Sequence, residues 1–297
     1  MSWYGVTIRM EGYTMAQLGD IVDAGIDYIS MTMRRDNPNV QQWLLSAHNY
    51  LREIAVHDDE IKHTKRLGYE GLAFGGSFVG ERERDTFCVF SGERAKRAYT
   101  LLYRHDVHVS RIDVQVSFRY AVPTTDAAQR AREEVKKDNT KLSSARQRNA
   151  TLIEDLRGGG TCYIGTRKSE QFARIYNKEA ESGDAHYKNV WRYEIQLKNR
   201  LAEKMAENFT KTLDPQETYS ATVVKQWLRH RGVNTPWKAE AEVLPLPRDT
   251  PVLTQSEARL KWLRDQVRPA IRQLLKYGLR DDIIDALGLD DPTTRNE

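Results

Sequence analysis

Three segments of the sequence combine acids, bases and a tyrosine in the alternating pattern of β-strands. The segments are 110–120 (SRIDVQVSFRY), 172–178 (FARIYNK) and 190–198 (VWRYEIQLK), and in each an apolar residue recurs at alternate positions. Because the side chains of a strand point alternately to its two faces, we expect each segment to have one apolar and one polar face. If the three strands are neighbours, their polar faces form one surface.

That polar surface would hold an inventory suited to phosphodiester chemistry. Its expected members are Arg111, Asp113, Gln115, Ser117, Arg174, Tyr176, Lys178, Arg192, Glu194, Gln196 and Lys198. The two carboxylates, Asp113 and Glu194, can hold a hard divalent ion that polarises a phosphate. The hydroxyl of Tyr176 can attack phosphorus and keep the cut strand bound covalently. Arg174 and Lys178 can favour the phenolate or stabilise charge on the phosphate.

The same pattern also has an interpretation without catalysis. Antiparallel sheets often have one wet face, on which cross-strand pairs of arginine with aspartate or glutamate are ordinary. A tyrosine such as Tyr176 is more often a packing residue than a nucleophile. The pattern alone therefore leaves both interpretations open.

The remaining segments favour an α+β fold, with a largely antiparallel sheet, flanking helices and a helical C-terminal appendage. Further strands are expected at 26–34, 68–80, 86–91 and 161–165, and helices at 14–24, 38–54, 95–103, 125–156, 199–210, 220–231 and 254–288. We expect a catalytic domain over residues 1–215 and a helical region over 216–297. The run LPLPRDTP (244–251) is typical of a linker.

Positive charge concentrates in residues 130–148, which hold seven Lys or Arg against three acids. A basic helix or loop of this kind can lie along the phosphates of DNA. The residues expected to contact DNA here are Arg130, Lys136, Lys137 and Lys141. The alternative is a solvated helix face with Glu–Lys pairs. Residues 220–231 are basic too, but they lack the turn signature of a helix-turn-helix.

Composition and motifs exclude several other classes. The chain is 39% hydrophobic and carries 46 Lys and Arg against 42 Asp and Glu, which suits a folded, mildly basic protein. Cys88 and Cys162 form no zinc-binding pattern, and no P-loop motif indicates a helicase. His105 and His108 are three apart, which favours a polar strand entry over a metal site. With no signal peptide or membrane-length apolar run, we expect a cytoplasmic protein without a membrane partner.

The sequence resembles the replication initiation factor family (Rep_trans), which comprises initiators of rolling-circle plasmids and phages and relaxases of some integrative conjugative elements. The resemblance covers about residues 26–200. The matching pieces, in the family's order, are IDYISMTM (26–33), FSG (90–92), SRIDVQVSF (110–118), GTRKSEQFARIYNKEAE (165–181) and WRYEIQLKN (191–199).

This resemblance implies roles for particular residues. Tyr176, Lys178 and Glu181 match the family's Y-x-K-x-x-E pattern, so that Tyr176 is the expected nucleophile. Asp113 and Glu194 match the acids of its R-x-D and R-x-E strands. The resemblance implies that these two acids and a third bind Mg²⁺ or Mn²⁺. The candidates for the third are Glu181, Glu179 and Glu70, and we also expect Arg111 and Arg192 to contact DNA.

The implied activity is strand-specific nicking of DNA at a replication origin, which is expected to be extruded as a hairpin. A 5′-phosphotyrosyl bond would form, a 3′-OH would prime synthesis, and a second transesterification would rejoin the strand. Two alternatives remain open: a relaxase that acts at a conjugative transfer origin, and a non-catalytic DNA-binding protein on the same scaffold. The resemblance further implies a homodimer, which would supply two tyrosines, and a host helicase is a further candidate partner.

Overall fold

The computed structural model describes residues 19–55, 57–124, 126–143, 147–154, 160–241, 243, 260 and 262–286. The chain divides into two compact units, Met1–Pro247 and Arg248–Glu297. The described part of the first unit contains one ten-stranded antiparallel sheet and several helices, so the expected α+β fold is confirmed.

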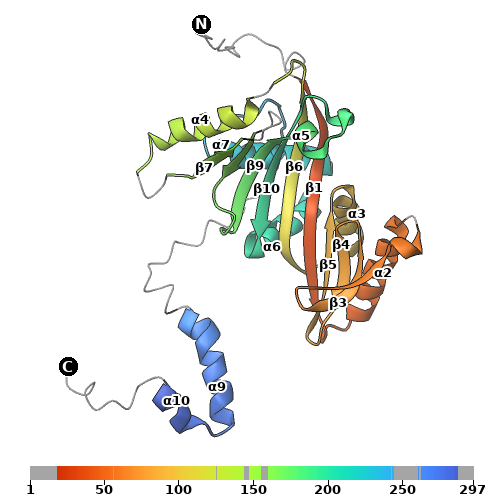
Figure 1. The fold of residues 1–297 in the computed structure, drawn as a ribbon, viewed down its shortest axis with the longest axis vertical. Helices are drawn as coiled ribbons and strands as arrows, with labels where there is room; N and C mark the ends of the chain where they lie inside the picture. The colour runs from red at the N-terminus through yellow and green to blue at the C-terminus, as the bar shows by residue number, and fades with distance from the viewer. Residues whose placement is uncertain are drawn as a thin grey trace, which may run out of the picture. The chain divides into compact units, whose positions relative to one another are not determined.

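The strands follow the order β2-β3-β4-β5-β1-β6-β10-β9-β8-β7 across the sheet. Their bounds are β1 (Gly19–Arg34), β2 (Lys62–Arg66), β3 (Tyr69–Phe74), β4 (Ser77–Glu81), β5 (Asp85–Ser91), β6 (His108–Tyr120), β7 (Ala150–Ile153), β8 (Thr161–Ile164), β9 (Gln171–Asn177) and β10 (Val190–Lys198). The long strands β1 and β6 run through the middle of the unit and join the two halves of the sheet (Figure 1).

The helices of this unit are short to medium in length. They are α2 (Val40–Ile54), η1 (Asp58–Glu60), α3 (Glu93–Leu102), α4 (Ala127–Asn139), α5 (Lys178–Ser182), η3 (Ala185–Tyr187), α6 (Asn199–Lys211) and α7 (Gln216–Arg229). Five of them, α2, α3, α4, α6 and α7, bury an apolar stripe in one large core with the sheet.

Strand alternation divides the sheet into two faces that differ in chemistry. The helix face carries the fully buried Ile29, Val114 and Ile195, which pack in the core beneath the helices. The polar face carries Asp113 and Glu194, which alternate with those residues along β6 and β10. Burial of the apolar side supplies the main driving force for folding and thereby fixes which side chains the other face presents.

The expected helix at 14–24 is wrong from residue 19 onward, and residues 14–18 lie outside the described part of the chain. Residues from Gly19 to Thr32 pair with β6, so β1 is a single strand of 16 residues. A Cβ at Gly19 would lie 1.9 Å from the carbonyl oxygen of Arg119, so glycine is needed for this close approach. Long-range strand pairing thus overrides a local pattern typical of a helix.

The expected helical region at 125–156 is only partly correct. Helix α4 ends at Asn139, whose side chain binds the backbone of Arg148 through N–H···Oδ1 at 2.9 Å and Nδ2–H···O at 2.7 Å. The chain then returns as β7, which pairs with β8. Residues 125, 144–146 and 155–156 lie outside the described residues.

The structure also contains strands that the sequence patterns did not distinguish. The region expected as one strand at 68–80 is the hairpin β3–β4, whose turn residues Gly75 and Gly76 both have positive φ. Strand β2 was not expected and forms one edge of the sheet.

Helix α7 belongs to the core of the first unit, whereas the sequence pattern had indicated that it belongs with the C-terminal region. The expected linker at 244–251 lies outside the described residues. The second unit contains η4 (Leu263–Val267), α9 (Arg268–Lys276) and α10 (Arg280–Ala286), and Leu274, Leu275 and Tyr277 are exposed there. Among the helices that the structure describes, none has the length and apolar character required to cross a membrane.

Candidate functional site

The three chemistry-bearing strands are neighbours, which is the condition on which the expected polar surface depended. Strand β10 lies between β6 and β9, with Gln196 opposite Asp113 and Arg192 opposite Tyr176. Glu194 pairs with Arg174 across the β10–β9 ladder. The polar face of these strands is therefore one continuous surface, on which the expected acids, arginines and tyrosine come together.

Two buried carboxylates on this surface are each held by an arginine. Asp113, which is 1% exposed, accepts hydrogen bonds from Arg111 Nε at 2.8 Å and Nη2 at 2.5 Å. Glu194, which is 2% exposed, accepts from Arg174 Nε at 2.9 Å and Nη2 at 2.8 Å. Such bidentate pairs fix the carboxylate and guanidinium planes relative to each other, and they compensate the buried carboxylate for its lost hydration.

The two acids influence one another through the sheet. Burial raises the pKa of Glu194 above its usual range, and the negative charge of Asp113 raises it further, while Arg174 opposes both effects. A cation between or beside the acids would relieve this repulsion. The pair offers hard oxygen atoms of the kind that Mg²⁺ or Mn²⁺ prefers, and in this structure those oxygens are bound by Arg111 and Arg174.

The three-carboxylate set implied by the resemblance is not assembled around this pair. In the part of the chain that the structure describes, no three His, Cys, Asp or Glu side chains gather as metal ligands. Glu181 instead binds Lys178 at 2.6 Å, and Glu179 accepts from the backbone N–H of Asn189 at 3.2 Å. Glu70 lies on β3 and pairs with Lys65, four strands from β6.

Tyr176 lies on the polar face of β9, with only 5% of its surface exposed. The guanidinium carbon of Arg174 is 5.1 Å from the ring centroid. Flanking cations were expected to favour the phenolate, and Arg192 and Arg174 do act in that direction. Burial and the charge of Glu194 outweigh them, however, so that the pKa of Tyr176 is raised. In this state the hydroxyl is a weak nucleophile that needs further activation.

Tyr176 nevertheless borders open space. A cavity of about 460 Å³ lies over the ends of β7, β8 and β9 and is lined by Tyr163, Arg174, Tyr176 and Glu181, among others. Because both the tyrosine and its neighbouring arginine line this cavity, a substrate phosphate could reach them together.

Lys178 does not belong to the β9 strand face on which the sequence pattern placed it. Strand β9 ends at Asn177, whose side chain accepts from the backbone N–H of Ala180 at 3.2 Å and so caps α5. Lys178 is the first residue of that helix, and its ammonium group binds Glu181 and lies 5.4 Å from the ring centroid of Tyr187. An N-capping asparagine is a sequence signal that would have indicated this boundary.

A further carboxylate near the site, Asp27, was missed. It is the extra residue of a β-bulge in β1, between the paired residues Ile26 and Tyr28. Its Oδ1 accepts from Arg192 Nη1 at 2.9 Å, and Arg192 Nε donates to Ser117 Oγ at 3.1 Å. The bulge thus delivers a negative charge that holds the arginine opposite Tyr176.

The residues expected to bind DNA have different surroundings. Arg111 and Arg192 are engaged in the carboxylate pairs described above. Lys136 and Lys137 are exposed in the last turn of α4, and Lys141 is exposed just beyond it. Arg130 pairs with Asp126 at 3.3 Å and lies over the ring of Tyr120. The basic segment therefore offers its lysines, rather than Arg130, to a partner.

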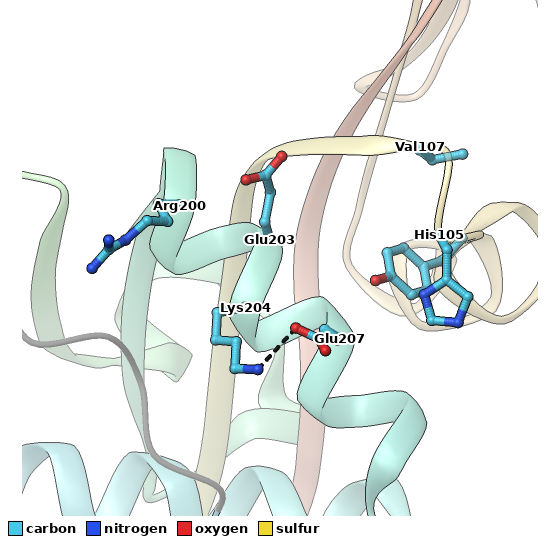
Figure 2. A pocket seen from close by; sticks show the side chains of 7 residues that line it. His105, Val107, Arg200, Glu203, Lys204 and Glu207 are labelled. Carbon is cyan, nitrogen blue, oxygen red and sulfur yellow. Dashed lines mark hydrogen bonds and ion pairs between the residues drawn. The ribbon is translucent and has the colours of Figure 1, made fainter. Parts of the chain in front are cut away.

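A second cavity, of about 450 Å³, lies where the connection between α3 and β6 meets α6 (Figure 2). Two of its charged residues pair with each other: Lys204 donates to Glu207 at 2.9 Å, and hydrogen bonds from Lys211 and Lys204 lower the pKa of Glu207 to about 2. His105 lines this cavity, whereas His108 binds Glu203.

Other expected residues have structural positions. Tyr193 lies on the helix face with Trp191, and its hydroxyl is 2.7 Å from that of Tyr120. The two cysteines, Cys88 and Cys162, are free and buried.

Comparisons with known proteins bear on the family of the chain. The family model of the replication initiation factor matches residues 107–287, which include Asp113, Tyr176 and Glu194; the pieces at 26–33 and 90–92 lie outside the match. A rolling-circle replication initiator protein from Geobacillus stearothermophilus is similar in structure, with a TM-score of 0.49 and 19% identity over 70% of this chain and 84% of that chain. No curated protein matches the chain. Because the family model covers more than half of its length, the chain belongs to the replication initiation factor family.

Proposed function

We propose that the protein initiates rolling-circle replication by nicking one strand of an origin with Tyr176 and later rejoining it. The observation that carries this proposal is the position of Tyr176. It lines an open cavity together with Arg174, on the same sheet face as the buried carboxylates Asp113 and Glu194. Membership of the replication initiation factor family supports the same biological role.

The reaction needs no external energy source. The Tyr176 hydroxyl oxygen attacks the scissile phosphorus, the bond to the 3′ oxygen breaks, and a 5′-phosphotyrosyl linkage and a free 3′-OH result. A 3′-OH attacks this linkage in the second step and releases the tyrosine. Because each step exchanges one phosphodiester for another, the strand can be resealed.

Arginines of this chain would stabilise the phosphate during attack. Arg174 lies beside the Tyr176 ring and lines the same cavity, and Arg192 is the cross-strand neighbour of Tyr176. Both act to lower the pKa of the tyrosine, which burial raises. Their guanidinium groups match the planar geometry of phosphate oxygens and oppose the negative charge that develops there.

We also propose a Mg²⁺ or Mn²⁺ cofactor, with Asp113 and Glu194 as the residues that would hold it. Asp27 is a further carboxylate close enough to raise the pKa of Glu194. When bound, the ion would polarise the phosphate and neutralise the leaving oxygen. A homodimer would provide a second Tyr176 for the closing step.

Covalent trapping tests this function directly. Supercoiled DNA containing the region that flanks the gene is incubated with the protein and Mg²⁺, and the denatured mixture is examined for protein linked to nicked DNA. We expect mass spectrometry to place the linked nucleotide on Tyr176. Tyr176→Phe should abolish both nicking and linkage while retaining DNA binding, since only a hydroxyl is removed.

The matched control is Tyr163→Phe, because Tyr163 lines the same cavity but lies on β8, opposite Arg174. This variant should nick normally. Linkage to any tyrosine other than Tyr176, or full activity of Tyr176→Phe, contradicts the assignment. Binding without any nicking by the wild-type protein would favour a non-catalytic DNA-binding protein.

A further inference from the structure

A third cavity lies on the N-terminal half of the sheet and has no role in the reaction proposed above. Its volume is about 650 Å³ and it is formed by β2, the β3–β4 hairpin and the residues that precede β2. Its lining includes Lys62, Arg66, the Gly75–Gly76 turn and Ser77. We call it the hairpin cavity.

The hairpin cavity faces the same side of the sheet as the candidate active site. Lys62 and Thr64 of β2 are opposite Ala73 and Gly71 of β3, and Ala73 is opposite Phe78 of β4. Phe78 packs in a small apolar cluster with Val89, which lies on the polar face of β5. By strand alternation, therefore, the charged groups of the cavity project on the Tyr176 side.

An aromatic side chain connects the hairpin cavity to the acids of the active site. Tyr28 is opposite Asp113 in the β1–β6 ladder, and the guanidinium carbon of Arg111 lies 4.0 Å from its ring centroid. On its other side Tyr28 is opposite Ser91, whose hydroxyl would lie 3.3 Å from a Cβ at Gly76. The half-buried ring thus lies between the acidic site and the turn that borders the cavity.

Two cations of the cavity lack an acidic partner. Within the described part of the chain, neither Lys62 nor Arg66 has a carboxylate at ion-pair distance, whereas Lys65 is paired with Glu70. Glu60 also lines the cavity, so its cations outnumber its acids by three to one. Arg66 Nη1 donates to the carbonyl of Gly76 at 3.5 Å, and this neutral acceptor leaves the positive charge of Arg66 available to an anion.

A further feature indicates a ligand rather than a merely solvated edge. Arg66 lies near enough to Tyr28 to affect its hydroxyl, whose pKa burial raises while Arg111 and Arg66 oppose the shift. An edge cation that only prevents strand pairing does not need this position beside an aromatic ring.

We propose that the Tyr28 ring and the hairpin cavity bind single-stranded DNA that extends from the nick site across the polar face, with a base stacked at Tyr28 and phosphates at Lys62 and Arg66. This inference rests on the proposed function. The arginine–tyrosine stack offers flat surfaces for a nucleobase, and stacking of this kind tolerates any sequence. Six strand spacings separate β9 from β3, or about 29 Å, so the track would accommodate several nucleotides.

The test measures fluorescence anisotropy of labelled oligo(dT) of sixteen nucleotides in EDTA, where cleavage plays no part. The Lys62→Ala/Arg66→Ala variant should bind more weakly and should lower the slope of log Kd against log salt by about 1.4, that is, about 0.7 for each phosphate that the protein no longer neutralises. Tyr28→Ala should weaken binding roughly 5- to 150-fold because a base can no longer stack there, and Tyr28→Phe should retain it. Both substitutions of the double variant lie on the edge strand β2, so this variant should fold even if Tyr28→Ala does not.

The matched control is Arg52→Ala, because Arg52 is an exposed arginine on α2, which packs against the helix face. Its affinity and salt slope should equal those of the wild type. Unchanged values for the double variant overturn the proposal, as does a loss of affinity confined to duplex DNA. Absence of oligo(dT) binding by the wild type overturns it as well. If nicking fails but the double variant still loses single-strand binding, the proposed catalytic function alone is refuted.

Discussion

Glu194 accepts hydrogen bonds from Arg174 Nε at 2.9 Å and Nη2 at 2.8 Å, although its carboxylate is only 2% exposed. The two residues are direct cross-strand partners on β10 and β9. The arginine therefore compensates a charge that the sheet has removed from water, and in the proposed reaction the same guanidinium would meet the phosphate. Stability requires Arg174 to stay paired with Glu194, whereas the proposed catalysis requires it to contact the phosphate.

Removing Arg174 should destabilise the protein because Glu194 would remain buried without a cation. Arg174→Ala should lower the free energy of unfolding by up to about 3 kcal/mol, at the lower end for buried pairs because the Arg174 side chain is 36% exposed. Urea denaturation above pH 8, where Glu194 is ionised in the folded wild type, measures the change. Adding Glu194→Gln should restore most of the stability, since the unpaired charge is then absent. If the double variant is less stable than the single one, the pair is not coupled in this way.

The raised pKa of Glu194 predicts a specific dependence on pH. Burial, reinforced by Asp113 and opposed by Arg174, raises it from 4.5 to about 8. The folded state then binds the proton more tightly than the unfolded state does. The stabilisation that protonated Glu194 contributes is fully present below pH 4.5. It is lost as pH rises toward 8, by at most about 1.4 kcal/mol per pH unit.

Nicking should show the opposite trend, because the ionised carboxylate serves the proposed cation. We expect activity to rise through the window in which stability falls. Glu194→Gln should remove the stability slope relative to wild type, as urea denaturation at several pH values would show. Parallel slopes for the two proteins would mean that Glu194 is ionised at its usual pKa.

The proposed cation site predicts that Asp113→Asn abolishes nicking but leaves DNA binding largely intact. A carboxamide has the shape of the carboxylate but not its charge, and an ion that serves chemistry need not serve recognition. Calorimetric titration with Mn²⁺ gives a readout apart from activity and should lose the binding event seen with wild type. Asp36→Asn is the control, since Asp36 is exposed and pairs with Arg34. Nicking at an undiminished rate in EDTA would refute the cofactor.

Asp27 is predicted to act as a positioning residue through Arg192. Asp27→Asn should lower kcat by about 10- to 100-fold, the range found for groups that orient a catalytic ligand, with little change in KM. A purely structural role would instead reduce thermal stability and leave the kcat of the folded fraction unchanged. Asp20→Asn is the control, because Asp20 is an exposed residue of the same strand and is expected to behave as wild type.

Strand alternation predicted most of the polar face because each of β6, β9 and β10 buries one side in the core. Residues of alternating polarity can satisfy that burial in only one register. The same logic fails at Lys178, where the Asn177 cap ends β9 and begins α5. It failed at Asp27 too. Ile26 and Ile29 both face the core although they are three residues apart, and this break in the two-residue alternation is the signature of a bulge.

The pKa of Tyr176 was beyond prediction from sequence spacing. Adjacent cations can be counted along a strand, but the degree of burial depends on strands and helices that pack from elsewhere in the chain. The N-terminal half of β1 illustrates the same limit, since its pairing with β6 joins residues far apart in the sequence. Local periodicity contains no information about such a partner.

The exposed lysines at the end of α4 are predicted to contact duplex DNA. Lys136, Lys137 and Lys141 are exposed, while Arg130 is paired with Asp126, so the lysines should carry most of the interaction with duplex DNA. Removing one phosphate contact should lower the slope of log Kd against log salt by about 0.9. The triple Ala variant should therefore lower that slope by about 2.7, as measured by anisotropy with a labelled duplex.

Arg130→Ala alone should change that slope little, because its guanidinium already has an acidic partner and the ring of Tyr120 beside it. The two variants together separate a DNA contact from a solvated helix face. If the triple variant keeps the wild-type slope, the lysines serve only solvation, and duplex recognition must lie elsewhere on the protein. If Arg130→Ala produces the larger change, the ion pair with Asp126 opens when DNA binds and the arginine is the principal contact.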